Sequence, residues 1–248
     1  MSEIREIKLP TKVVESVTQN PSTLIIYSHP KAGKTTLLSK LDNCLILDLE
    51  GGSKYVDALK MEVNSLDELQ QIGAAIVKAG KPYKYVAIDT LSALEDLCIP
   101  YATAMYKQSP MGKSFDGVNV LELPKGAGYF WLRQAWDIWM TKIHKLSDHI
   151  ILIGHLKDSV IDKAGKEVSA KDLDLMGKLK QIVCASADAI GYMYRGVDDS
   201  LEITFKSSEQ LNCGSRCNHL KGQVIKIADY DKEKNDLTNV QWDKIYLD

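Results

Sequence analysis

The chain has 248 residues, which is enough for one large α/β domain but leaves little room for two. Hydrophobic residues make up 45% and charged residues 26% of the sequence, as in an ordinary soluble globular protein, so disordered and fibrous classes are excluded. The formal net charge of −2 excludes a uniformly basic nucleic-acid-binding protein, although local basic patches remain compatible with it.

Neither a membrane segment nor a zinc site is favoured by the sequence. No segment approaches the roughly 20 consecutive apolar residues of a membrane span, and the N-terminal MSEIREIKLP lacks the apolar core of a signal peptide. We therefore expect a cytoplasmic protein without a membrane partner. Five cysteines, mostly in apolar runs, favour reduced core thiols. Cys213, Cys217 and His219 are close together, but no second ligand pair completes the tetrahedral set of a structural zinc site.

Short apolar runs rich in Ile, Leu and Val predict strands that are buried on both faces, as in a parallel sheet. These runs are Thr23–Tyr27, Cys44–Leu49, Tyr85–Asp89 and His149–Gly154. Helical patterns follow the first three of them, at Lys34–Lys40, Ser65–Ala79 and Leu91–Tyr106. This alternation is the βαβ arrangement, in which ligands gather at the carboxyl ends of the strands. We therefore expect the functional residues at that edge of the sheet.

The second half of the chain is less regular. Residues 107–128 contain four glycines and two prolines, and they predict an irregular insertion before another helix at about Tyr129–Leu146. The three tryptophans of that helix have a spacing that favours core packing over a base-stacking platform. From Ala189 onward, three strand-like segments predict a C-terminal β meander over about 189–248. We expect residues 1–248 to form a single domain.

The segment SHPKAGKTT follows a strand and opens a helix, which is the context that the phosphate-binding motif G-x-x-x-x-G-K-[ST] requires. Ser28 replaces the first glycine of the motif, and a residue with a Cβ would be strained there if its φ were positive. Backbone N–H groups at the helix N-terminus would hold phosphates, Lys34 would reach the β and γ oxygens, and Thr35 would ligate Mg²⁺. The expected nucleotide-binding residues are Ser28, His29, Pro30, Lys31, Ala32, Gly33, Lys34, Thr35 and Thr36.

Three further residues are expected at the same rim of the sheet. Asp89 ends an apolar strand and has the form of the Mg²⁺-side aspartate of phosphate-loop NTPases. Because Thr90 follows it, the base that activates water must come from elsewhere. We expect Glu50, which ends the second strand before two glycines, to be that carboxylate rather than a solvated loop residue. For His155 two interpretations stay open, since it could sense the γ-phosphate or simply cap its strand.

Taken in order, several segments resemble the RecA-like AAA-type ATPases found in many bacteriophages, including the single-strand annealing ATPases of the Sak-four type. The segments are IIYSHPKAGKTTLL, LDLEGGSKYVDAL, YVAIDTLSALEDL, IILIGHLKDS and LMGKLKQIVCASADAIGYMYR. The resemblance spans most of the chain and implies an α/β fold with a RecA-like core, that is, a mostly parallel sheet flanked by helices. It also implies ATP hydrolysis with ATP and Mg²⁺ bound by Lys34 and Thr35, Asp89 on the metal, Glu50 as base and His155 as γ-phosphate sensor.

The same resemblance implies partners. They are single-stranded DNA, further copies of the chain in a ring or filament, and a single-strand binding protein, all in the host cytoplasm if the gene belongs to a phage. RecA-like proteins place DNA-contacting loops at the position of Lys157–Lys180, where six lysines oppose five acidic residues. The small net positive charge of this segment is weak evidence for contacts with DNA phosphates, and a solvated mixed-charge hairpin is the alternative.

A cation supplied by a neighbouring subunit often completes the site in RecA-like assemblies. Lys206 and Arg216 are the candidates here, and solvated loop cations are the alternative reading of both. Two other functions would use the same phosphate loop. A small-molecule kinase usually needs an arginine-rich lid, which a chain with four arginines does not favour. A nucleotide-gated assembly protein with little hydrolysis stays open.

Overall fold

The structure is a computed structural model that describes residues 9, 11–15, 19–163 and 166–248, without the side chains of 159–169. Most of the N-terminal segment on which the signal-peptide prediction rests lies outside the described residues. Within the described part of the chain, no helix is both long enough and apolar enough to cross a membrane.

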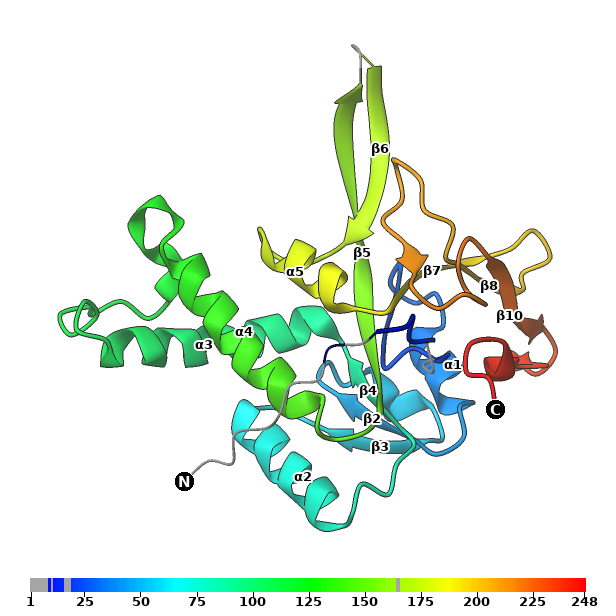
Figure 1. The fold of residues 1–248 in the computed structure, drawn as a ribbon, viewed down its shortest axis with the longest axis horizontal. Helices are drawn as coiled ribbons and strands as arrows, with labels where there is room; N and C mark the ends of the chain where they lie inside the picture. The colour runs from blue at the N-terminus through cyan, green and yellow to red at the C-terminus, as the bar shows by residue number, and fades with distance from the viewer. Residues whose placement is uncertain (1–8, 10, 16–18, 164–165) are drawn as a thin grey trace.

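An eleven-stranded sheet forms the centre of the molecule (Figure 1). Its parallel part has the order β7-β1-β5-β4-β2-β3. These strands are β1 (Thr23–Ser28), β2 (Cys44–Asp48), β3 (Leu59–Glu62), β4 (Tyr85–Asp89), β5 (His149–Lys163) and β7 (Ala189–Arg195). The prediction of a mostly parallel sheet is confirmed. Sequence analysis missed β3, because all four of its residues are exposed and form no apolar run.

Both faces of the sheet are covered because side chains along each strand point alternately to opposite sides. Ile25 and Tyr27 of β1 share one core with the helices α2, α3, α4 and α5, whereas Leu24 and Ile26 share the other with α1 and the C-terminal segment. The helices are α1 (Lys34–Ser39), α2 (Leu66–Lys78), α3 (Leu91–Gln108), α4 (Gly128–Ile143) and α5 (Leu179–Ser186). The predicted α/β fold with flanking helices is therefore confirmed.

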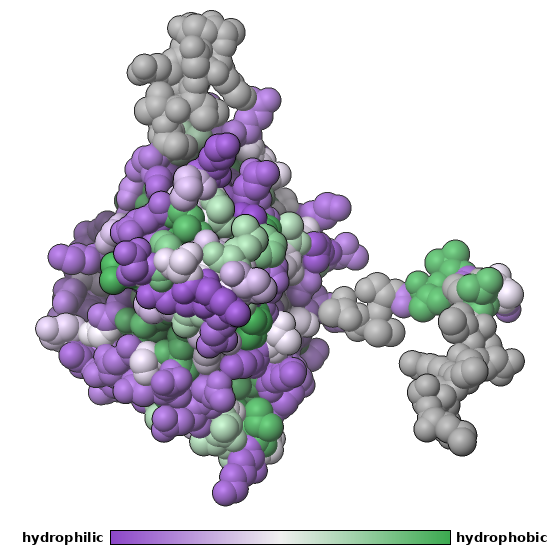
Figure 2. Space-filling model, turned by 90° about the vertical axis from the view of Figure 1, so that its left-hand side faces the viewer, coloured by the Kyte–Doolittle hydropathy of each residue, from purple (hydrophilic) through white to green (hydrophobic). Residues whose placement is uncertain are grey.

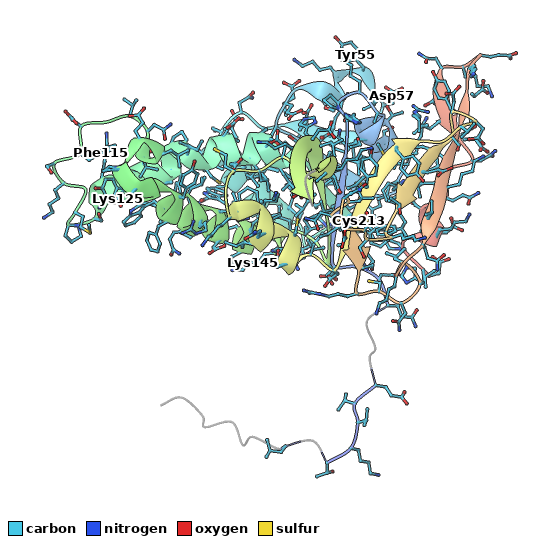
Figure 3. The ribbon with its side chains drawn as sticks, turned by 90° about the horizontal axis from the view of Figure 1, so that it is seen from above. Tyr55, Asp57, Phe115, Lys125, Lys145 and Cys213 are labelled. Carbon is cyan, nitrogen blue, oxygen red and sulfur yellow. The ribbon has the colours of Figure 1, made fainter. Side chains whose placement is uncertain are left out.

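Helices α3 and α4 lie side by side and extend away from the sheet (Figure 1). Trp136 and Trp139 of α4 are each only 2% exposed and belong to the core, which confirms the packing interpretation. The irregular insertion is also confirmed. It contains the short 3₁₀ turns η2 (Val120–Glu122) and η3 (Pro124–Gly126), and Phe115 and Lys125 lie at its far end (Figure 3). This end of the molecule is mainly hydrophilic, with hydrophobic residues in small patches (Figure 2).

The C-terminal strands continue the sheet on the other side of β7. The strands β8 (Leu201–Thr204), β10 (Val224–Asp231) and β11 (Asp236–Thr238) follow one another in antiparallel pairs. The two-residue strand β9 (Gly214–Ser215) pairs with the beginning of β7. A 3₁₀ turn, η4 (Trp242–Lys244), packs into the second core. The predicted C-terminal β meander is confirmed.

The strand that begins at His149 is longer than predicted. It continues to Lys163 and forms a hairpin with β6 (Lys166–Leu173), which projects from the edge of the sheet (Figure 1). A Cβ on Gly154 would lie 2.1 Å from a methyl group of Leu173, so only glycine allows the base of the hairpin to pack this closely. The alternative reading of residues 157–180 as a hairpin is correct for the described residues 157–163 and 166–173, whereas the segment after Leu173 leads into helix α5.

Helix α3 holds the base of this hairpin. The hydroxyl of Ser92 donates to the carbonyl of Asp174 at 3.1 Å, and Lys157 pairs with the Asp174 carboxylate at 3.3 Å. The N–H of Met176 donates to Glu95 at 3.0 Å. Glu95 is 4% exposed, and its burial raises its pKa from 4.5 to about 7, although the bond from Met176 opposes this. The Glu95 carboxyl is therefore largely protonated in mildly acidic solution.

This raised pKa predicts a pH-dependent stability. Between about pH 4.5 and 7 the folded chain binds a proton at Glu95 that the unfolded chain releases, so this residue's contribution to stability falls as the pH rises. Over that interval Glu95→Gln should become more stable relative to the wild type by up to about 3 kcal/mol, because the amide cannot ionise. Urea unfolding of both proteins across this pH range measures the difference. Parallel stability curves would contradict the prediction.

Candidate active site

The predicted phosphate loop connects β1 to α1 at the carboxyl edge of the sheet. Ser28 ends β1 in extended backbone, and the left-handed conformations fall instead on Lys31 (φ 61°) and Gly33 (φ 104°). The strain considered for a positive φ at Ser28 therefore does not arise. Gly33 is the N-cap residue of α1, and its φ is one that glycine adopts at little cost.

Lys34 is fixed by the loop that it belongs to. Its side chain is largely buried, and Nζ donates to the hydroxyl of Ser28 and the carbonyl of His29, both at 3.1 Å. Burial lowers the pKa of the Lys34 ammonium, and the carboxylates of Asp89 and Glu50 oppose that shift. The serine that replaces the motif's first glycine thus supplies an acceptor that positions the lysine.

Thr35 and Asp89 form a short hydrogen bond at the end of β4. The Thr35 hydroxyl donates to Oδ2 of Asp89 at 2.6 Å, and Asp89 is 5% exposed. Burial raises the pKa of the Asp89 carboxyl, and the hydrogen bond from Thr35 opposes this. A hydroxyl and a buried carboxylate are hard oxygen ligands of the kind Mg²⁺ uses, and the cation would offset the cost of the buried charge. The pair therefore fits the predicted metal position.

Other ligands of such an ion would come from outside the chain. In the described part of the chain, no group of three or more His, Cys, Asp or Glu side chains is arranged to hold a metal ion. Mg²⁺ in nucleotide sites usually keeps several waters and binds phosphate oxygens in addition to one or two protein ligands. An ion beside Thr35 and Asp89 would complete its shell in this way.

Glu50 lies opposite Lys34, and its carboxylate is held by two neighbours. Nε2 of His155 lies 3.0 Å from Oε1, and the hydroxyl of Thr90 donates to the same oxygen. The hydrogen bond from His155, followed by that from Thr90, keeps the pKa of Glu50 below its ordinary value although burial opposes this. Glu50 is therefore ionised and able to accept a proton. The strand-cap interpretation of His155 is wrong, because β5 runs on to Lys163.

Asp48 has a different role from Glu50, two residues away. It is 2% exposed, and its carboxylate accepts the N–H groups of Glu50 at 3.1 Å, Gly51 at 2.8 Å and Ser53 at 2.8 Å. Burial raises the pKa of Asp48, but the hydrogen bonds, chiefly those from Ser53, outweigh it and lower the pKa overall. Asp48 thus shapes the loop and leaves Glu50 as the carboxylate that faces the site.

These residues surround one cavity of about 690 Å³, a size usual for small-molecule sites. Among the predicted residues, those that line it are Pro30, Lys31, Gly33, Lys34, Thr35, Thr36, Glu50, Asp89 and His155. Ser28 lies behind the lining, where it contacts Lys34. Two further walls were not predicted, namely the rim Tyr55–Asp57 (Figure 3) and the β10–β11 turn with Lys234–Asp236. Tyr55–Asp57 fall within the segment LDLEGGSKYVDAL, which was used only for the family resemblance, and no motif marks the β10–β11 turn.

The structure does not bring Lys206 or Arg216 to the phosphate loop of their own chain. Arg216 pairs with Asp188 at 3.6 Å, and Asp188 accepts the N–H of Thr23 at the amino end of β1, the opposite edge of the sheet. Lys206 follows β8, which runs antiparallel to β7 and away from the carboxyl edge. Their predicted role in a neighbouring subunit's site stays a prediction.

The cysteines near His219 have structural surroundings. Cys213 and Cys217 are buried free thiols, and Cys217 belongs to the second core. His219 Nε2 lies 2.9 Å from the carbonyl oxygen of Ile245. These contacts account for the burial of both thiols and for the position of the imidazole.

A family described as the AAA domain matches residues 20–217. The chain belongs to this family. The match includes the phosphate loop, Glu50, Asp89 and His155, and it ends before the β10–β11 turn. No curated protein matches the chain. Among solved structures, the crystal structure of the RadB recombinase is similar, with a TM-score of 0.45 and 13% sequence identity over 86% of this chain and 93% of that chain.

Proposed function

We propose that this AAA-domain protein is a RecA-like, Mg²⁺-dependent ATPase that acts on single-stranded DNA in phage-type recombination or strand annealing. The observation that carries the ATPase part is the meeting of Lys34, the Thr35–Asp89 pair and Glu50 around one cavity. An ammonium, a hard-oxygen pair and an ionised carboxylate are the groups that phosphoryl transfer to water requires.

The residues have separate tasks in this reaction. The loop N–H groups and Lys34 bind the β- and γ-phosphates, and Thr35 and Asp89 would hold Mg²⁺, which would supply positive charge beside the phosphate oxygens. Glu50 takes a proton from the water that attacks the γ-phosphorus, while the bond from that phosphorus to the β-γ bridging oxygen breaks. The products are ADP and inorganic phosphate. Thr90 and His155 keep the Glu50 carboxylate oriented toward the cavity.

The position of Glu50 favours hydrolysis over a nucleotide-gated assembly protein that barely turns over. A solvated loop glutamate would have no fixed direction, whereas this one is bonded to side chains from β5 and from the residue after β4. A carboxylate held in one orientation is what general-base catalysis needs.

The proposal of DNA as a partner rests on the resemblance and on the continuity of β5. The strand carries His155 at the cavity and then runs directly into the β5–β6 hairpin. A γ-phosphate that contacts His155 would thus be coupled to the hairpin through one strand. The described lysines there do not carry the proposal by charge alone, since Lys157 pairs with Asp174 and Lys180 with Asp172.

Further parts of this proposal concern assembly. We infer one ATPase domain over 1–248 that self-associates into a ring or filament, with a cation from Lys206 or Arg216 reaching the next subunit. A single-strand binding protein would be a further partner. These proposals follow from the resemblance. Self-association with a cation that acts on the next subunit predicts that ATP hydrolysis depends on assembly of the protein.

Removing the Lys34 ammonium and removing the Glu50 carboxylate should both impair ATP hydrolysis, but for different reasons. Lys34→Ala should abolish ATP hydrolysis and weaken nucleotide binding, whereas Glu50→Gln should bind Mg²⁺ and ATP nearly normally and hydrolyse it about 10²–10⁴ times more slowly, as for loss of a general base. Phosphate release and nucleotide titration measure the two effects. Wild-type turnover in Lys34→Ala, or a larger loss in Asp48→Asn than in Glu50→Gln in correctly folded protein, would contradict the assignment.

The nucleotide state should control DNA binding. Single-stranded DNA should bind more tightly with a non-hydrolysable ATP analogue than with ADP, because His155 lines the cavity and directly precedes the part of β5 that pairs with β6 in the hairpin. Fluorescence anisotropy with a labelled oligonucleotide measures this, and His155→Ala should lose the difference. Equal binding in all nucleotide states would favour an enzyme of nucleotide metabolism.

A further inference from the structure

Arg195 lies beside the phosphate loop, although it is far from the loop in sequence. Strand β7 runs parallel to β1 with Tyr192 opposite Tyr27, so Arg195, the last residue of β7, reaches the edge at which the loop leaves β1. A Cβ placed on Gly33 would lie 3.5 Å from Nη2 of Arg195. The guanidinium group therefore lies next to the residue that caps helix α1.

Two neighbours fix the direction of this guanidinium group. Nη1 donates to the carbonyl of Asp199 at 2.9 Å, and Cζ lies 4.6 Å above the ring of Tyr230. The Tyr230 hydroxyl in turn donates to the side chain of Asn235, which lines the cavity. Because Nη1 is engaged and one face is covered, the Nη2 side of the group is the part directed at the loop.

The charge of Arg195 has no carboxylate partner within 4.0 Å in the described part of the chain. Lys40 and Lys232 differ in this respect, since Lys40 pairs with Asp236 and Lys232 pairs with Asp199, whereas Lys31 of the loop is also without a carboxylate partner among the described residues. An exposed arginine next to a loop that gathers N–H groups is therefore available to an anion. With Nη1 engaged, Nε and Nη2 remain as a planar pair of donors whose spacing matches two phosphate oxygens.

We propose that Arg195 donates to the phosphate chain of the nucleotide bound by the phosphate loop of its own chain. The inference rests on the proposed function and adds to the site a cation that the motif does not contain. Tyr230 and the Asp199 carbonyl position Arg195 for this contact. The C-terminal meander thus takes part in nucleotide binding through β7 and β10, in addition to closing the sheet.

The test measures nucleotide affinity in the Arg195→Ala protein. Loss of a charge-assisted phosphate contact should weaken binding of Mg²⁺–ATP by about tenfold to a hundredfold. Competition experiments with inorganic tripolyphosphate, which has no base or ribose, should show that its affinity for the Arg195→Ala protein falls by the same factor. The matched control is Lys232→Ala, which removes an exposed cation of the same region that is already paired with Asp199 and should bind both ligands like the wild type.

The outcomes separate this inference from the proposed function. If the wild type binds no nucleotide, the proposed function itself fails. If it binds ATP and Arg195→Ala binds equally well, the inference is overturned. A loss confined to ATP, with tripolyphosphate competing equally well in both proteins or in neither, would also overturn it, since Arg195 would then contact the nucleoside. Since Arg195 is exposed, the Arg195→Ala protein without nucleotide should have the same melting temperature as the wild type.

Discussion

The hydrogen bond between Thr35 and Asp89 is the contact on which the site depends. It joins the start of α1 to the end of β4, although β1 and β4 are separated in the sheet by β5. A carboxylate buried to this extent is costly without a compensating charge or donor. The Thr35 hydroxyl supplies a donor, and a bound cation would supply the charge. The cation that we propose as a ligand would thus offset the free-energy cost of keeping the Asp89 carboxylate buried.

The parallel order of the sheet makes this contact possible. Strands β1, β2 and β4 end at one edge and β5 passes it at His155, so the loop, Glu50, Asp89 and His155 meet there without any of them being close in sequence. The buried strands keep these ends in register because a slip by one residue would turn apolar side chains out of two cores. The stability of the core and the geometry of the site therefore have the same origin.

Sequence patterns predicted the parts of the fold that have a strong local signal. Continuous apolar runs marked β1, β2 and β4, and the motif marked the phosphate loop. Strand β3 was missed because its exposed residues show no such run, and β5 was cut short because it becomes polar where it leaves the sheet as a hairpin. The sequence favoured Glu50 because two glycines follow it, but the burial of Asp48 and its hydrogen bonds to the loop N–H groups had no sequence signal.

Contacts between distant segments had no sequence signal. Arg195 meets Gly33 because β7 pairs with β1, and Tyr230 meets Arg195 because β8 brings β10 back beside β7. No periodicity connects these three positions, and the two cations that sequence analysis favoured for a site, Lys206 and Arg216, did not include Arg195. The serine at the first motif position looked like a defect, yet its hydroxyl holds Lys34. This role of the serine depends on the rotamer of the Lys34 side chain, which the sequence alone does not fix.

The most direct test of the central claim is the position of a metal ion. A crystal of the protein grown with Mn²⁺ and a non-hydrolysable ATP analogue would place the ion by its anomalous scattering. The account predicts a single strong peak between the β- and γ-phosphates, within about 2.2 Å of the Thr35 hydroxyl oxygen, with Asp89 on the ion directly or through water. A nucleotide bound elsewhere, or an ion remote from both Thr35 and Asp89, would contradict it.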